Sequence, residues 1–139
     1  MKVLLINGSP RREGNTFIAL SEAARALEAE GVGAEIVSIG TKAVQGCIAC
    51  GKCAELGRCV FNDALYNERL AYKPAAAVAV CRRGGASATF DRLNKYFTIS
   101  NMPVVSSQYW NSVHGRLPGE AAQDAEGLQT MRVLARNMA

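Results

Sequence analysis

Two kinds of hydrophobic spacing alternate along the chain and predict strands and helices in turn. Short uninterrupted apolar runs are typical of buried strands, and apolar residues three or four positions apart are typical of amphipathic helices. The predicted strands cover residues 3–7, 34–39, 75–81 and 104–106. The predicted helices cover residues 16–30, 64–70, 89–96 and 120–137. Because strands and helices alternate, we expect an α/β fold with a parallel sheet and right-handed crossovers.

The composition is typical of one globular domain. Of the 139 residues, 49% are hydrophobic and 20% are charged, so we expect a single domain over residues 1–139. The net charge of +4 is scattered and forms no basic stripe with interleaved aromatic residues, which argues against a nucleic-acid partner. The N-terminal run lacks the features of a leader, and no stretch approaches the roughly 20 apolar residues of a membrane helix. We therefore expect a cytoplasmic protein with no membrane partner.

A loop rich in hydrogen-bond donors follows the first predicted strand and leads into the first predicted helix. The start of a helix exposes backbone N–H groups and carries the positive end of the helix dipole, so it favours an anion. Side chains that bind phosphate, with a glycine that allows close approach, occur at Ser9, Arg11, Gly14, Asn15 and Thr16. The loop therefore predicts a phosphate site, and the alternative is a polar helix cap that binds nothing.

The kind of phosphate is limited by what this loop lacks. Without G-K-[ST] it has no lysine of a nucleoside-triphosphate loop, and without G-x-G-x-x-G it has no dinucleotide fingerprint. Hydroxyl groups and one arginine around a single site suit a terminal phosphate monoester, such as that of FMN.

The loop resembles the first loop of the flavodoxin-like NADPH-dependent FMN reductase family, including its iron–sulfur flavoprotein branch. That family carries the pattern G-S-x-R-x-x-G-N-T, which is matched by Gly8, Ser9, Arg11, Gly14, Asn15 and Thr16. The resemblance implies that the loop holds the FMN phosphate within a three-layer αβα fold whose parallel sheet has strand order 2-1-3-4-5. It also implies NAD(P)H as the electron donor and a homodimer.

One part of that fold has no counterpart in the sequence. Only four strands are predicted, and the family's third strand, its flavin-contacting G-S-P-x-Y loop and the following helix are missing between residues 66 and 72. Such a unit takes at least roughly 30 residues. Either the chain lacks the unit, or the printed sequence closes up over it. We expect the second, because a sheet without its middle strand should not fold stably.

Four cysteines form the pattern C-x2-C-x2-C-x5-C in a glycine-punctuated loop at residues 46–59. They are Cys47, Cys50, Cys53 and Cys59. The pattern resembles the compact cluster motif of iron–sulfur flavoproteins, so the four thiolates are candidate ligands of a [4Fe–4S] cluster. A zinc ion, and cysteines that are empty or paired in a disulfide, are the alternatives. The fifth cysteine, Cys81, is expected to be a small core residue.

A second candidate region follows the strand at 75–81, at the sheet edge where ligands bind in this architecture. It contains Arg82, Arg83, Gly84 and Gly85, which in the family line the flavin ring. Backbone N–H groups or a guanidinium there stabilise the negative charge of a reduced flavin; the alternative is a glycine turn with solvated arginines. His114, on the same rim, is expected to be a surface or loop residue and not a proton donor. No residue is assigned as catalytic, because flavin hydride transfer needs no protein acid or base.

Together these features predict an FMN-dependent oxidoreductase that passes electrons from NAD(P)H through FMN to a small-molecule or protein acceptor. Two other classes stay open. One is a non-enzymatic electron carrier that holds FMN or a cluster. The other is a metal- or redox-responsive binding module in which the cysteines act and the flavin site is vestigial.

Overall fold

The structure is a computed structural model, and it describes residues 1–40, 48–57, 60 and 72–139. Several predictions fall outside these residues. They are the helix at 64–70, the junction between residues 66 and 72, and two of the four loop cysteines, Cys47 and Cys59. These stay predictions.

The N-terminal third forms a strand–helix–strand unit close to the predicted one. Strand β1 (Lys2–Asn7) pairs in parallel with β2 (Gly33–Ser38), from Lys2 opposite Gly33 to Asn7 opposite Ser38. Helix α1 (Asn15–Ala29) connects them, one residue earlier at each end than predicted. Gly31 follows the helix with a φ of +76°, a left-handed conformation that a glycine adopts without the steric penalty of a side chain.

The second strand pair differs from the prediction. Strand β3 (Ala79–Cys81) is the last part of the apolar run at 75–81, and it pairs in parallel with β4 (Ser112–His114). The sequence prediction missed β4. The predicted strand at 104–106 forms only an isolated bridge, between Val104 and Ala75. From that bridge to the start of the β3–β4 ladder, the chain advances four residues before β3 and eight before β4, so the segment before β4 is four residues longer.

The remaining helices also differ from their predicted bounds. Helix α3 (Ala86–Ile99) is longer at both ends than the predicted 89–96, and a four-residue helix, α2 (Cys53–Leu56), lies in the cysteine loop. The helix predicted at 120–137 is two elements: a 3-10 helix η1 (Glu120–Gln123) and α4 (Ala125–Met138). They are separate because Asp124 lies between them and caps α4 with its side chain.

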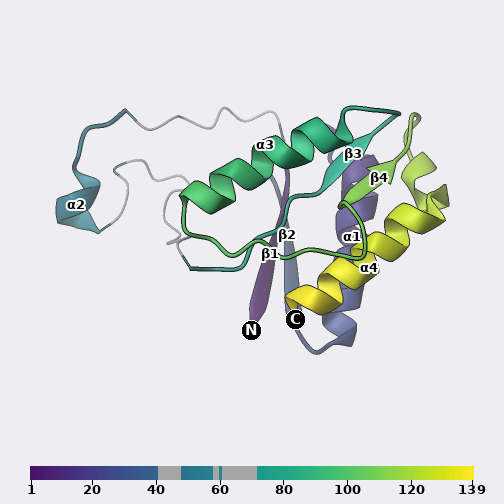
Figure 1. Cartoon of the computed structure of the whole chain (residues 1–139), viewed down its shortest axis with the longest axis horizontal. Coiled ribbons are helices and arrows are strands. Elements are labelled where there is room, and N and C mark those ends of the chain that lie inside the picture. Colours follow the sequence, from purple (N-terminus) through teal and green to yellow (C-terminus); the bar gives the residue numbers. More distant parts are fainter. Residues whose placement is uncertain (41–47, 58–59, 61–71) are drawn as a thin grey trace.

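The core lies where α1 and α4 pack against each other and against the strands (Figure 1). Leu27 of α1, Val113 of β4 and Met131 of α4 are fully buried in it. Glu22 of α1 joins the two helices at the edge of this core, because it pairs with Arg25 and with Arg132 of α4. This packing confirms an α/β fold with parallel strands.

The opposite side of the strands is less covered. In Figure 1, α3 lies apart from α1 and α4, and Ala86 is the only residue of α3 that is buried. Leu4 and Ile6 of β1 are each 44% exposed. Within the described residues no hydrogen bonds join the β1–β2 pair to the β3–β4 pair, so the strand order 2-1-3-4-5 is not confirmed.

Candidate functional site

Three parallel strands end at the same edge of the molecule, and the candidate residues follow those ends. Strands β1, β3 and β4 end at Asn7, Cys81 and His114. The ends of β3 and β4 are held together beyond their ladder, because the N–H of Gly115 donates to the carbonyl of Cys81 at 2.9 Å. This carboxyl edge is where α/β sheets bind their ligands.

The loop after β1 is shaped by Asn7, a residue that the sequence analysis did not single out. Its side chain is fully buried, and its Oδ1 accepts from the N–H of Ser9 at 3.0 Å. Its Nδ2 donates to the carbonyl of Arg12 at 3.3 Å and to Ser38 Oγ at 3.4 Å. Ser9 Oγ then accepts from the N–H of Arg11 at 3.2 Å. Asn7 therefore fixes the turn that presents Ser9 and Arg11, and only its place at the end of an apolar run could have indicated this role.

The N-terminus of α1 opens directly from this loop. Gly14 is its N-cap, no side chain caps the helix, and the first helical hydrogen bond runs from Ile18 N to Gly14 O at 3.2 Å. The three backbone N–H groups before that bond, those of Asn15, Thr16 and Phe17, therefore have no partner within the helix. A Cβ on Gly14 would lie 3.1 Å from Arg11 Cβ, so glycine permits this tight turn.

These groups fit the phosphate of FMN. They provide free N–H donors at the positive end of a helix, the hydroxyls of Ser9 and Thr16, and the exposed guanidinium of Arg11. Asn15 differs from the other predicted ligands, because its amide bonds to the backbone of residues 117–121.

The second candidate region lies at the end of β3. Arg82, Arg83, Gly84 and Gly85 are all exposed, and Cys81 Sγ donates to the carbonyl of Arg83 at 3.0 Å. Gly85 has a φ of +89° and is the N-cap of α3, again without a side-chain cap. A Cβ on either glycine would meet nothing within 4 Å, so a ligand can approach this backbone closely.

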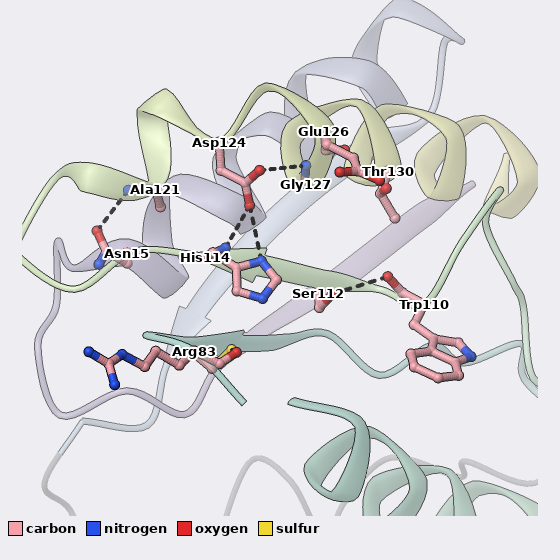
Figure 2. A network of polar contacts seen from close by, with 11 residues as sticks. Asn15, Arg83, Trp110, Ser112, His114, Ala121, Asp124, Glu126, Gly127 and Thr130 are labelled. Carbon is pink, nitrogen blue, oxygen red and sulfur yellow. Dashed lines mark hydrogen bonds and ion pairs between the residues drawn. The ribbon is translucent and has the colours of Figure 1, made fainter. Parts of the chain in front are cut away.

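A polar network at the same edge was not predicted from the sequence (Figure 2). Asp124 Oδ2 accepts from the N–H of His114 at 2.7 Å, and Asp124 Oδ1 accepts from the N–H of Gly127 at 3.0 Å. Burial of the carboxyl raises its pKa, but the hydrogen bonds from Gly127 and His114 outweigh this and hold the pKa of Asp124 below its ordinary value. An aspartate directly before a periodic helix is a recognised N-cap signal, which could have located this residue.

Glu120 fixes the turn after β4. Its Oε2 accepts from the N–H groups of Arg116 at 2.6 Å and Leu117 at 2.8 Å. Both backbone hydrogen bonds lower the pKa of Glu120, and the one from Leu117 has the larger effect. A shallow cavity of about 350 Å³ adjoins the turn, and Arg82 and His114 also line it. The turn after β4 therefore faces the predicted flavin-ring region.

A larger cavity of about 610 Å³ lies at the end of β2, between Phe17 of α1, Ile36 and Ser38. None of the predicted FMN ligands lines it. We therefore do not assign it to the phosphate.

Two of the four loop cysteines lie in the described residues. Cys53 begins α2 and Cys50 lies three positions earlier; both are exposed and neither is in a disulfide with another described cysteine. Ala49, Gly51 and Gly57 around them have φ values of +53°, +71° and +66°, so the chain curls tightly here. Among the described residues, no group of three or more His, Cys, Asp or Glu side chains lies close enough to hold a metal ion, so the cluster site stays a prediction.

The comparisons with known proteins agree with the motifs. Residues 1–66 match the model of the family described as NADPH-dependent FMN reductase. An iron–sulfur flavoprotein of Methanocaldococcus jannaschii is 28% identical over 185 aligned positions, which take in 100% of this chain and 96% of that protein. An iron–sulfur flavoprotein of Archaeoglobus fulgidus is 41% identical over 63 residues, 45% of this chain and 29% of that protein. The resemblance to the flavodoxin-like NADPH-dependent FMN reductase family, in its iron–sulfur flavoprotein branch, is therefore confirmed.

Proposed function

We propose that this protein is an FMN-dependent oxidoreductase that binds the FMN phosphate at the loop between β1 and α1. The observation that carries the proposal is the uncapped N-terminus of α1, which opens onto Ser9 and Arg11 at the carboxyl end of β1. The family match over residues 1–66 covers this loop entirely.

The chain's own residues would bind and orient the cofactor. Ser9, Arg11 and Thr16 would hold the phosphate, and the exposed backbone of residues 82–85 would lie against the ring system. Bound FMN supplies the capacity to accept a hydride and to pass electrons on singly or in pairs. The residues at this edge provide position and positive charge, and no side chain needs to act as an acid or base.

NAD(P)H is the proposed electron donor, and a small molecule or a protein is the proposed acceptor. The homodimer and the cytoplasmic location also stay predictions. None of the helices in the described part of the chain is long and apolar enough to cross a membrane.

A [4Fe–4S] cluster at the cysteine loop is proposed from the cysteine pattern and from the names of both relatives. Anaerobically purified protein should then contain iron and show the visible absorption of a cluster; iron-free protein would contradict this part.

We also propose that the printed sequence closes up over one strand–loop–helix unit between residues 66 and 72, as expected from the sequence. The 185 aligned positions exceed its 139 residues by 46, so at least 46 positions of the alignment have no residue of this chain opposite them. In the described residues the β1–β2 pair is not hydrogen-bonded to the β3–β4 pair, and Leu4 and Ile6 of β1 are exposed. Both observations agree with a missing strand between the two pairs. Inserting the corresponding segment of the Methanocaldococcus relative should tighten FMN binding. An unchanged FMN affinity would contradict this proposal.

The phosphate site is tested by titrating the full chain with FMN and with riboflavin, which lacks the phosphate, and following flavin fluorescence. Arg11→Ala removes a charge-assisted hydrogen bond, so it should weaken FMN binding about tenfold or more and leave riboflavin binding unchanged. Arg12→Ala is the matched control, because it removes the same charge from the next position, which is also exposed. No saturable FMN binding by the wild type would refute the proposal.

Oxidoreductase activity needs a separate measurement. Protein supplied with FMN should consume NADPH steadily in the presence of a quinone or ferricyanide. Tight FMN binding with negligible NADPH consumption would favour a non-enzymatic electron carrier instead.

A further inference from the structure

The side chain of Asn15 connects two loops that are far apart in the sequence. Its Nδ2 donates to the carbonyl of Leu117 at 3.0 Å, and its Oδ1 accepts from the N–H groups of Gly119 at 3.0 Å and Ala121 at 3.3 Å. Figure 2 shows Asn15 extending from the start of α1 toward Ala121. All three partners are backbone groups, so the contact depends on where the turn lies and not on which side chains it carries.

The two N–H donors fix the orientation of this amide. Reversing it would place the NH₂ group against the N–H groups of Gly119 and Ala121, where two donors would face each other. In the observed orientation Oδ1 accepts twice, so both of its lone pairs are used. The oxygen of Asn15 is therefore unavailable to any further donor.

Gly115 makes room for this contact. A Cβ at position 115 would lie 2.7 Å from Asn15 Nδ2 and 2.7 Å from the backbone N of Ala121, which is closer than side chains pack. The N–H of Gly115 also donates to the carbonyl of Cys81, the last residue of β3. A continuous set of contacts thus leads from the phosphate loop, through the turn at 115–121, to residues 82–85.

Hydrogen bonds within the 115–121 turn also hold it in place. Glu120 accepts from the N–H groups of Arg116 and Leu117, and Gly119 has a φ of +89°. Asn15 therefore holds an already ordered turn against the start of α1, with Arg116 lining the cavity beside Arg82.

We propose that the side chain of Asn15 is a positioning group for FMN binding, which acts by fixing the 115–121 turn to the phosphate loop. This role rests on the proposed function above. It separates Asn15 from Ser9, Arg11 and Thr16, whose sequence motif it shares.

Hydrogen exchange on the full chain without FMN tests the contact itself. Asn15→Ala should raise amide exchange at Gly119 and Ala121, because both N–H groups lose their acceptor. Asn15→Asp keeps that acceptor but loses the donor to the Leu117 carbonyl, so both amides should exchange more slowly than in Asn15→Ala. This comparison also covers the case in which the alanine variant fails to fold. Asn137→Ala is the control: it removes another asparagine side chain that bonds to backbone, at Ser106 O, far from the turn.

FMN titration of a double-mutant cycle tests the consequence. Asn15→Ala and Gly115→Ala should each weaken FMN binding about tenfold, and the double variant should bind no worse than the weaker single variant, because both changes release the same turn. Additive losses, an unaffected Gly115→Ala variant, or unchanged exchange in Asn15→Ala would overturn the positioning role while leaving the proposed function standing. Failure of the wild type to bind FMN would overturn both.

Discussion

Replacing Asp124 by alanine should remove the hydrogen bonds that fasten α4 to β4. The carboxylate accepts the N–H of Gly127 in the first turn of α4 and the N–H of His114 in β4. Loss of an N-cap costs about 1 kcal/mol, and loss of a second, charge-assisted hydrogen bond costs about 1.5 kcal/mol at a partly exposed site. We therefore expect Asp124→Ala to lower the free energy of unfolding by roughly 2–3 kcal/mol and Tm by roughly 10 °C.

The pH dependence gives this prediction a second, independent readout. The pKa of Asp124 is lowered in the folded protein, so the unfolded chain binds the proton more readily, and the stabilisation is present at neutral pH. It is lost as the pH falls below about 4 and through the lowered folded-state pKa. The gap in stability between wild type and Asp124→Ala should therefore narrow in acid.

Urea unfolding followed by circular dichroism, at neutral pH and at several acidic values, measures both effects. Asp124→Asn is the matched control, because it keeps one acceptor oxygen but does not titrate; it should lose about half as much stability at neutral pH. Equal stability of wild type and Asp124→Ala, or a gap that stays constant as the pH falls, would refute the reasoning.

Three further substitutions test the packing by denaturant unfolding. Gly127→Ala should destabilise the protein by about 1–3 kcal/mol despite the better helix propensity of alanine, because its Cβ would overlap the capping carboxylate and lie 3.0 Å from Val113 Cα; a more stable variant would contradict this. Glu22→Gln should lower the free energy of unfolding by about 1–2 kcal/mol, because a neutral amide bonds less strongly to Arg25 and Arg132. The exposed Glu28→Gln is the control and should change stability very little; equal effects of the two substitutions would count against a stabilising role of the Glu22 ion pairs. Gly85→Ala should cost about 1 kcal/mol because its φ is +89°, and a neutral result would show that the N-cap of α3 rearranges freely.

Local patterns were sufficient to predict most of the described elements. The apolar run at 3–7 and the spacing of Phe17, Leu20 and Leu27 located β1 and α1 to within a residue or so. Strand β4 was missed because Ser112–His114 has one apolar residue, Val113, and its burial depends on helices distant in the sequence. The bridge at Val104 was mistaken for a full strand because two adjacent valines favour extended backbone whether or not a partner continues beside them.

The candidate site also contains residues that the sequence could predict and contacts that it could not. Ser9, Arg11 and Gly14 belong to a contiguous motif, so the sequence alone could predict them. The contacts of Asn15 could not be predicted, because its three partners lie 102 to 106 positions away and are backbone groups that leave no mark on residue identity. Asp124 was hidden for a related reason. The 3-10 turn before it continues the helical spacing, so the helix seemed to begin at Glu120.

The unpaired strands bear on how the molecule behaves in concentrated solution. In the described part of the chain, β1 pairs only with β2 and β3 only with β4, so each has a free edge, and Leu4 and Ile6 lie exposed on β1. Free edges beside apolar side chains are templates on which strands of other molecules add. Light scattering should therefore rise steeply with protein concentration, and Leu4→Lys is the single change best suited to keep the protein dispersed.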